Sequence, residues 1–486
     1  MKKKIVGILV STLFIATAVL PAVGTTNKTI NKKNVQMQSQ DAYDMVIIAP
    51  SIFSNILQKL INHKNKYGIN TTLKTTESIY KEYTGVDKPE QIKYFIKDAL
   101  ETWHIKYVLL VGGMKSYFFG DPKDDVNQGS KSFYVPVRYT NVDDGEYERG
   151  GYISDLYYAD IYDSYGNFSS WDSNGNGVFA EWKGIKKDKI DLYPDVYLGR
   201  LACRNTQEVK ITVNKIITYE STPADPSWFK KMVVVGGENW DDVGTNYLEG
   251  EVQCDKALSY MPEFTPVKLY ASNRDSGGLV PSPKDIVSTI SKGCGFLYFA
   301  GFGSPREWNT HWPGDFNIYN WTGGIKCIDF LKLKNKEKLP ICIAEGNCLN
   351  QFNVTILACL KNPVGMNIYQ GSTPESWGEW LSRKIGGGAI ATIADTGATW
   401  GYMGEDGDLD NDGVNDPDCV EAASGYMTTQ FFKIYNESHA ALGQVFGETI
   451  KQYLDTYPGM SAQVHAHTVE TWTLLGDPSL MIGGYI

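Results

Sequence analysis

The sequence predicts an α/β fold made of two adjacent units, each with a mainly parallel sheet flanked by helices. Short apolar runs of strand length alternate with segments of helical periodicity. The alternation breaks at the proline-containing segment 222–226 and then restarts, which marks a boundary between two units. Two later apolar runs end in small residues, as buried parallel strands do at the carboxyl edge of a sheet. With 486 residues, the chain is long enough for two or three domains.

The N-terminus has the pattern of a secretory signal peptide over residues 1–24. Three lysines precede an apolar run, and Ala22 and Gly24 supply the small residues of a cleavage site. The run of about 16 apolar residues is shorter than the about 20 that a membrane-spanning helix needs, which favours a cleaved signal over an anchor. Residues 25–40 are polar and are expected to form a flexible leader. We therefore expect a secreted or cell-surface protein with no membrane span in the mature chain.

The first unit is expected over residues 41–225. Its apolar runs and helical patterns alternate in the order strand, helix, helix, strand, and a loop-rich stretch rich in Gly, Asp, Ser and Tyr follows at 114–190. A further strand and helix close the unit. The predicted strands are 45–50, 107–113 and 195–200, and the predicted helices are 52–66, 89–103 and 206–221.

The second unit is expected over residues 226–486 and repeats the alternation. Its apolar runs are typical of a buried parallel sheet, and its helical segments have one apolar side. The predicted strands are 231–237, 295–302, 339–348 and 388–397, and the predicted helices are 246–260, 286–292, 374–385, 424–436 and 440–455.

Composition and charge exclude some classes of function. The chain carries 56 acidic and 46 basic residues, a net charge of −10, which argues against a nucleic-acid binder because phosphate neutralisation needs a basic face. The eight cysteines contain no CxxC pair, so a zinc ribbon is not expected. Cys294, Cys342 and Cys359 lie in apolar runs and are expected to be buried free thiols. No motif indicates an organic cofactor.

Two apolar runs of the second unit carry the most informative motif. The run at 295–304 ends in Gly-Phe-Gly-Ser, and about 40 residues later the run at 339–348 ends in Glu-Gly-Asn-Cys. Adjacent parallel strands bring such ends to one edge of the sheet, where a cysteine peptidase could hold a thiolate, a histidine and an oxyanion site. Gly301 and Gly303 would let a substrate backbone approach closely.

Four ordered blocks resemble the gingipain family of cysteine peptidases, which have a caspase-like fold. Residues 301–304 resemble the Gly-His-Gly-Ser block of the family, and residues 345–355 resemble its nucleophile block. Residues 194–200 are similar to its interdomain strand and residues 475–480 to its terminal block. The resemblance covers about 41–486. It implies two caspase-like subdomains, an active site in the second, and a peptide or protein as substrate or ligand.

The departures from the family pattern fall on the catalytic residues. Phe302 stands at the position of the histidine, and a phenyl ring cannot accept a proton. Aligned without gaps, the family cysteine falls on Asn347, whereas one deletion places it on Cys348. His311, nine residues beyond Phe302, is the nearest substitute base in the sequence, although a loop histidine between aromatic residues is the simpler interpretation.

An acidic loop in the second unit predicts a structural calcium site. Its carboxylates recur at every second position, and Gly413 allows the sharp turn of a calcium-binding loop. A solvated acidic turn is the alternative. Residues 172–181 form a weaker loop of the same kind. The predicted ligands are Asp408, Asp410, Asp412, Asp416 and Asp418 in the first loop, and Asp172, Asn174, Asn176 and Glu181 in the second.

Asp155 lies in a block, 154–160, that is similar to a gingipain segment which, in the arginine-specific members, supplies a carboxylate to the basic P1 residue of the substrate. The resemblance implies that Asp155 would favour a cationic side chain if it faced the active site. A structural aspartate that caps a turn is the alternative.

Three functional hypotheses remain open at the level of sequence. The first is a secreted protein with the peptidase fold and impaired catalysis, because Phe302 replaces the general base. The second is an active cysteine endopeptidase that uses Cys348 with a displaced base such as His311. The third is a non-enzymatic extracellular protein that binds peptides or surfaces.

Overall fold

The computed structural model of the protein describes residues 42–142, 151–239, 247–315, 321–361, 373–405 and 407–485. The signal peptide and the leader predicted for residues 1–40 lie outside the described residues, as does the side chain of Cys359. Residues 41–486 hold together as one unit through their internal contacts.

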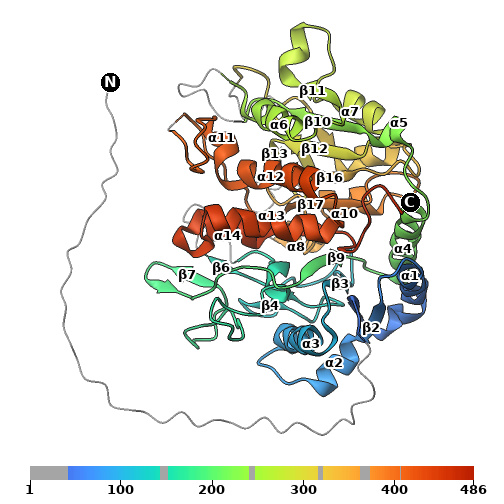
Figure 1. The fold of residues 1–486 in the computed structure, drawn as a ribbon, viewed down its shortest axis with the longest axis vertical. Helices are drawn as coiled ribbons and strands as arrows, with labels where there is room; N and C mark the ends of the chain where they lie inside the picture. The colour runs from blue at the N-terminus through green and yellow to red at the C-terminus, as the bar shows by residue number, and fades with distance from the viewer. Residues whose placement is uncertain are drawn as a thin grey trace, which may run out of the picture. The chain divides into compact units, whose positions relative to one another are not determined.

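A ten-stranded sheet runs through this unit (Figure 1). Strands from residues 41–225 fill one side and strands from residues 226–486 the other, so the two predicted halves share a single sheet; the boundary at residue 225 stays a prediction. In spatial order the strands are β11 (Thr265–Tyr270), β10 (Lys231–Gly236), β12 (Phe296–Ala300), β16 (Ile341–Glu345), β17 (Ala391–Asp395), β18 (Trp472–Leu475), β9 (Tyr197–Leu201), β3 (Tyr107–Val111), β1 (Met45–Ala49) and β2 (Thr71–Thr75).

The two halves of the sheet run in opposite directions and meet at β18. Strands β11, β10, β12, β16 and β17 are mutually parallel, and β18 is antiparallel to β17 through pairs such as Thr392 with Leu475. On its other side β18 pairs in parallel with β9 at Arg200. The carboxyl ends of β12, β16 and β17 therefore lie at one edge of the sheet, as the sequence predicted for the strand-end motif.

Helices cover both faces of the sheet. In the second half, α6, α12, α13 and α14 lie over the face that carries Phe296 and Ile343, and α7 and α10 lie over the face that carries Phe299 and Cys342. The helices are α1 (Ser54–Lys66), α2 (Thr76–Glu82), α3 (Lys88–Trp103), α4 (Thr206–Glu220), α5 (Pro226–Phe229), α6 (Glu249–Ser259), α7 (Pro283–Ile290), α8 (Ile356–Lys361), α10 (Trp377–Arg383), α11 (Asp418–Glu421), α12 (Ala423–Ser438), α13 (Leu442–Thr456) and α14 (Gln463–Thr471).

Short elements fill the connections between these helices and strands. Three small sheets lie outside the main one, and five 3₁₀ helices complete the described turns. The small sheets contain β13 (Phe302–Gly303), β14 (Glu307–Asn309) and β15 (Ile325–Lys326); β4 (Gln128–Gly129) and β5 (Val137–Arg138); and β6 (Asn141–Val142), β7 (Glu181–Lys183) and β8 (Lys186–Lys187). The 3₁₀ helices are η1 (Ser51–Phe53), η2 (Asp155–Tyr158), η3 (Ala271–Asp275), η4 (Cys327–Lys332) and η5 (Gly459–Ser461).

Local sequence signals explain where several helices begin. Asp87 caps α3 by accepting the backbone N–H of Glu90 (3.0 Å), and Asn205 caps α4 by accepting that of Glu208 (3.0 Å). Every strand and helix predicted above has a counterpart in the structure. In the main sheet the prediction missed β2, β11 and β18, because β2 and β11 are edge strands of partly polar sequence and β18 has only four residues. It also missed the helices α2, α5, α8, α11 and α14 and the short strands of the small sheets.

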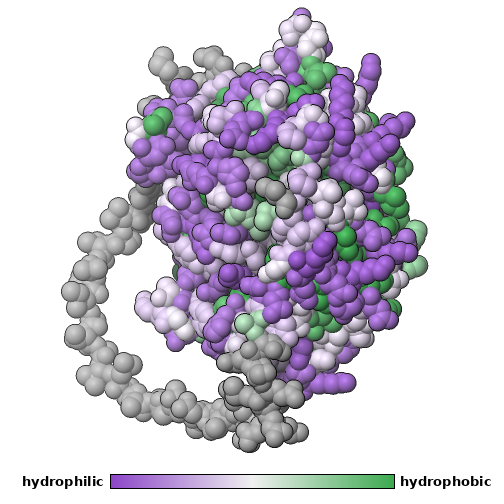
Figure 2. All heavy atoms as spheres, turned by 45° about the vertical axis from the view of Figure 1, so that its right-hand side comes forward, coloured by the Kyte–Doolittle hydropathy of each residue, from purple (hydrophilic) through white to green (hydrophobic). Residues whose placement is uncertain are grey.

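The surface is largely hydrophilic on the face seen in Figure 2, with hydrophobic residues in small groups between the polar ones. Within the described ranges, none of the helices has both the length and the apolarity to cross a membrane. Cys294 and Cys342 are buried free thiols in the structure, which agrees with the expectation for those two. Burial raises the pKa of the Cys294 thiol to about 12.

A buried ion cluster ties the C-terminal segment to the first half of the molecule. The Lys64 ammonium on α1 donates to both oxygens of Glu220 on α4 (2.8 and 2.9 Å) and pairs with Asp477 (2.8 Å). His63 Nε2 lies 3.0 Å from Glu220, and the backbone N–H of Met481 donates to Glu220 (2.8 Å). Burial opposes the charge on Lys64, but the two carboxylates outweigh it and raise its pKa.

We expect Lys64→Met to destabilise the protein by about 3–5 kcal/mol, because it leaves two buried carboxylates without their cation. The free energy of unfolding in urea measures the effect. Lys59→Met is the matched control, since Lys59 is exposed on the same helix, and it should change stability by less than about 0.5 kcal/mol. Equal effects of the two substitutions would contradict a stabilising role for the cluster.

Candidate functional site

The structure brings the two strand-end blocks into contact. Ala300 of β12 pairs with Glu345 of β16. Phe302 and Asn347 each follow two residues after these paired strand ends. A Cβ atom placed on Gly303 would lie 2.7 Å from the carbonyl carbon of Gly346 and 2.9 Å from the nitrogen of Asn347. The positions that the gingipain resemblance assigns to the histidine and the ungapped cysteine therefore lie side by side at the sheet edge.

Three aromatic rings meet at the strand end where the gingipain resemblance places the general base. Phe302 lies edge-on to His311 (ring centroids 5.7 Å apart) and to Trp321 (5.4 Å), and His311 stacks on Trp321 (4.0 Å). The backbone of His311 is fixed because its N–H donates to the carbonyl of Glu238 (3.0 Å). His311 is thus beside Phe302 in space. Sequence reasoning missed Trp321, which lies 19 residues beyond Phe302 and belongs to no motif.

The candidate nucleophile positions differ in exposure. Cys348 is only 1% exposed, has a φ of +60°, and donates its backbone N–H to the carbonyl of Gly397 (2.7 Å). Asn347 is half-buried, and its Oδ1 accepts the backbone N–H of Thr399 (2.6 Å) in the loop after β17. The Thr399 hydroxyl in turn donates to Asp395 (3.1 Å). A backbone N–H that is already bonded, as in Cys348, is not available to an oxyanion.

The glycines of the first block make room for the chain itself. A Cβ atom on Gly301 would lie 2.7 Å from the carbonyl oxygen of Asn309, and one on Gly303 would collide with the second block, as described above. Both glycines are therefore needed for packing within the protein. A role in admitting a substrate backbone, expected from the sequence, is not needed to explain them.

Two buried carboxyl groups lie beneath the site at equivalent strand ends. Burial and, after it, the nearby Asp395 carboxylate together raise the pKa of Glu345 to about 8. Burial likewise raises the pKa of Asp395 to about 7, although the Thr471 and Thr399 hydroxyls donate to its two oxygens. Sequence reasoning did not single out either residue, although an acidic side chain at the end of a buried strand is itself a signal.

Asp155, the candidate for binding a basic side chain, is engaged inside the protein. Its two oxygens accept bonds from Arg200 Nε (2.6 Å) and a second guanidinium nitrogen (2.7 Å), and both residues are buried. Arg200 also donates to the carbonyl oxygen of Gly112 (2.8 Å). This geometry favours the structural alternative, because the carboxylate is already neutralised by an internal cation.

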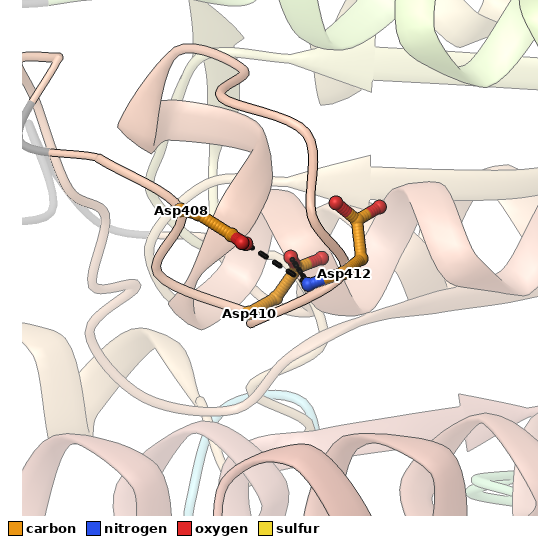
Figure 3. A group of neighbouring side chains, drawn as sticks. All are labelled: Asp408, Asp410 and Asp412. Carbon is orange, nitrogen blue, oxygen red and sulfur yellow. Dashed lines mark hydrogen bonds between the residues drawn. The ribbon is translucent and has the colours of Figure 1, made fainter.

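The first acidic loop gathers three of its five predicted ligands. Carboxylate oxygens of Asp408, Asp410 and Asp412 lie within 4.8 Å of one another, and both Asp408 and Asp410 accept the backbone N–H of Asp412 (Figure 3). Burial and the neighbouring carboxylates raise the pKa of Asp410 to about 6. Asp416 instead pairs with Lys256, and Asp418 is buried at the start of α11.

The second loop has the same hydrogen-bond pattern as the first. The backbone N–H of Asn176 donates to Asp172 and Asn174 (3.0 Å each), just as that of Asp412 does in the first loop. Asp188 accepts the N–H of Ser173 (2.8 Å), and in the first loop Glu421 accepts that of Leu409 (2.8 Å). Glu181 accepts the side-chain amide of Asn176 (2.6 Å). The sequence analysis missed the supporting carboxylates because they lie beyond each loop.

The fold and the paired strand ends define a protein of the caspase-like cysteine peptidase class. The chain belongs to peptidase family C25, whose model matches residues 38–483. The gingipain resemblance and the α/β fold class, with its mainly parallel sheet flanked by helices, are thereby confirmed.

Individual relatives are distant. The chain is 22% identical over 454 residues to gingipain R2 of Porphyromonas gingivalis strain W83. The aligned region covers 90% of this chain and 46% of that protein. The chain is 22% identical to gingipain R1 of Porphyromonas gingivalis, with 90% of this chain and 34% of that protein covered. It thus spans less than half the length of these relatives. The crystal structure of the Arg-specific cysteine proteinase gingipain R has the same fold, with a TM-score of 0.58 and 18% identity over 92% of this chain and 79% of that one.

The raised pKa of Glu345 predicts a pH-dependent stability. The folded state keeps a proton on Glu345 up to about pH 8, whereas the unfolded state releases it near the ordinary glutamate pKa of 4.5, so stability should fall as pH rises between these values. Glu345→Gln should remove up to about 1.4 kcal/mol per pH unit of this loss. Thermal midpoints at pH 5 and pH 8 measure the effect, with the exposed Glu337→Gln as control. If the thermal midpoint changed equally between the two pH values in the wild-type protein and in Glu345→Gln, the result would contradict a protonated Glu345.

Proposed function

We propose that this protein is a secreted member of peptidase family C25 that retains the peptide-binding fold but is impaired in Cys–His catalysis. Family membership supports a peptide or protein as its substrate or ligand. The proposal that it is secreted rests on the signal-peptide pattern of residues 1–24.

The observation that carries this proposal is Phe302 at the histidine position, in direct contact with the second strand-end block. General-base catalysis needs a group that can accept a proton at that point, and a phenyl ring cannot. The ungapped register adds a second loss, since it puts the amide of Asn347 where the family has a thiol. The burial of Cys348 and its bonded backbone N–H support the same conclusion.

An active cysteine endopeptidase that uses Cys348 and His311 is the second candidate. The contact between the rings of His311 and Phe302 favours it, because it places an imidazole at the edge of the site. This candidate requires Cys348 to become accessible to substrate, which its 1% exposure opposes. If catalysis is lost completely, the first proposal becomes a non-enzymatic protein that binds peptides or surfaces.

We also propose that the loop at 408–412 binds a structural Ca²⁺ ion, with the loop at 172–181 as a second, weaker site. Three carboxylates within 4.8 Å of one another suit a hard cation with oxygen ligands. The raised pKa of Asp410 reflects, after burial, repulsion from neighbouring carboxylates, and a bound cation would relieve that repulsion. In the second loop, Asp172 and Glu181 are the acidic members of the predicted ligand set.

We expect the purified protein to show no thiol-dependent hydrolysis of a peptide library in the presence of calcium, because the site lacks its proton acceptor. A peptidyl thiol-reactive inhibitor should also fail to label it. Cys348→Ser serves as the control. Hydrolysis in the wild-type protein that Cys348→Ser abolishes would establish the second candidate instead.

The same assay distinguishes the two registers. We expect Phe302→His alone to remain inactive and the double variant Phe302→His/Asn347→Cys to gain measurable hydrolysis, because only the double variant restores both family residues at the adjoining positions. Circular dichroism checks that each variant is folded. Activity in Phe302→His that Cys348→Ala removes would assign the nucleophile position to Cys348.

Chelation tests the calcium proposal. Removal of a bound ion destabilises the native state by mass action, so EDTA should lower the thermal midpoint by about 3 °C relative to buffer with excess CaCl₂. The variant Asp408→Asn/Asp412→Asn should lose most of the difference between the two buffers. An identical midpoint in both buffers for the wild-type protein would mean that these loops are solvated acidic turns.

A further inference from the structure

A β-hairpin in the first half of the molecule projects from its surface next to the second acidic loop. Strands β7 and β8 are antiparallel, with Lys183 opposite Lys186, and β7 at the left of Figure 1 extends away from the body. The two-residue turn begins with Gly184 at a φ of +57°, a left-handed value that suits glycine at the first turn position. Ile185 is therefore held at the tip.

All the exposed side chains of this hairpin are lysines or the isoleucine at its tip. Ile185 is 103% exposed, so it contacts nothing else in the described part of the protein. The four exposed lysines lie on both sides of it within seven residues. The exposed residues of 181–189 are Lys183, Gly184, Ile185, Lys186, Lys187 and Lys189.

The acidic residues of the same segment point inward and serve the acidic loop. Asp188 is 1% exposed and accepts the backbone N–H groups of Ser173 and Glu181 (2.8 Å each). Glu181 is buried and accepts the amide of Asn176. Their carboxylates are thus largely withdrawn from the hairpin surface, which presents local positive charge on a chain whose net charge is −10.

Several contacts fix the hairpin to the rest of the protein. Lys187 donates to the carbonyl oxygen of Met460, and its ammonium lies 3.7 Å from the centre of the Trp182 ring. Gln463 donates to the carbonyl oxygen of Trp182 (3.2 Å), which ties β7 to helix α14. Lys187 and Trp182 therefore hold the hairpin. The Lys186 ammonium lies 3.9 Å from Glu181, but its side chain is 67% exposed, so Lys183, Lys186 and Lys189 can all reach a partner.

We propose that this hairpin, residues 181–189, docks the protein on the surface of an anionic phospholipid bilayer. Lysines placed around an exposed apolar tip match a membrane interface, where the ammonium groups meet the headgroups and the aliphatic side chain enters the acyl boundary. A soluble polyanion would use the lysines but would gain nothing from Ile185. Charge complementarity and the isolated apolar tip together favour the bilayer.

Co-sedimentation with vesicles tests the proposal. The purified protein should bind vesicles of phosphatidylcholine with phosphatidylglycerol and not vesicles of phosphatidylcholine alone. The triple variant Lys183→Gln/Lys186→Gln/Lys189→Gln should bind about 100-fold more weakly, which corresponds to about fivefold for each lysine. Ile185→Ser should bind about tenfold more weakly, because it removes the apolar contribution.

Matched controls separate the hairpin from general surface charge. Lys284→Gln/Lys292→Gln/Lys334→Gln removes three exposed lysines elsewhere, and Ile385→Ser removes another exposed isoleucine; both should bind as the wild type does. Equal binding to neutral and anionic vesicles, or equal losses in the control and hairpin variants, would overturn the proposal. Unchanged binding in Ile185→Ser with loss in the lysine variant would also overturn it and indicate a soluble polyanion as the partner. None of these results depends on peptidase activity.

Discussion

The arrangement of this protein depends on the position of β18, a four-residue strand from the end of the chain that lies in the middle of the sheet. It pairs antiparallel with β17 and parallel with β9, and so joins the two halves. The buried amide of Asn350, in the candidate nucleophile block, donates to carbonyl oxygens on both β17 (Thr392, 3.2 Å) and β18 (Thr473, 3.0 Å). The loop that holds Asn347 and Cys348 is thus fixed by the same strand that unites the halves. Lys64 reinforces this arrangement by binding Asp477, two residues beyond β18.

The strand-end site combines a close-packed backbone with a group of aromatic side chains. The close contact of Gly303 with Gly346 and Asn347 involves the backbone, so it does not depend on which side chains stand at positions 302 and 347. The rings of Phe302, His311 and Trp321 pack together at the strand end, and of the three only the imidazole of His311 can accept a proton. Beneath them, Glu345 and Asp395 have raised pKa values, which place neutral carboxyl groups at the site over much of the acidic range.

Elements with a long apolar run could be predicted from the sequence, whereas short or partly polar elements could not. Strands β12 and β16 have continuous apolar runs because both of their faces are buried, and that pattern identifies a central parallel strand. Strand β18 is too short for its period to be recognised, and its partners β9 and β17 are far away in the chain. Asp155 shows the same limit at a candidate site residue, since its block was recognised but its bond to Arg200 was not. The acidic loops were found from spacing alone, whereas their supports, Asp188 and Glu421, lie outside the spacing pattern.

The sequence by itself determined the fold class, the order of the strand-end blocks and the presence at position 302 of a phenyl ring, which cannot accept a proton, because these depend on local periodicity and on the chemistry of one side chain. Only the tertiary structure decided that the two halves share one sheet and that Trp321 and His311 surround Phe302. It also decided that Cys348 is buried while Asn347 bonds to Thr399. These features depend on contacts between residues that are not neighbours in the chain. No local pattern specifies such contacts, because they form only when the strands pair and the loops between them close.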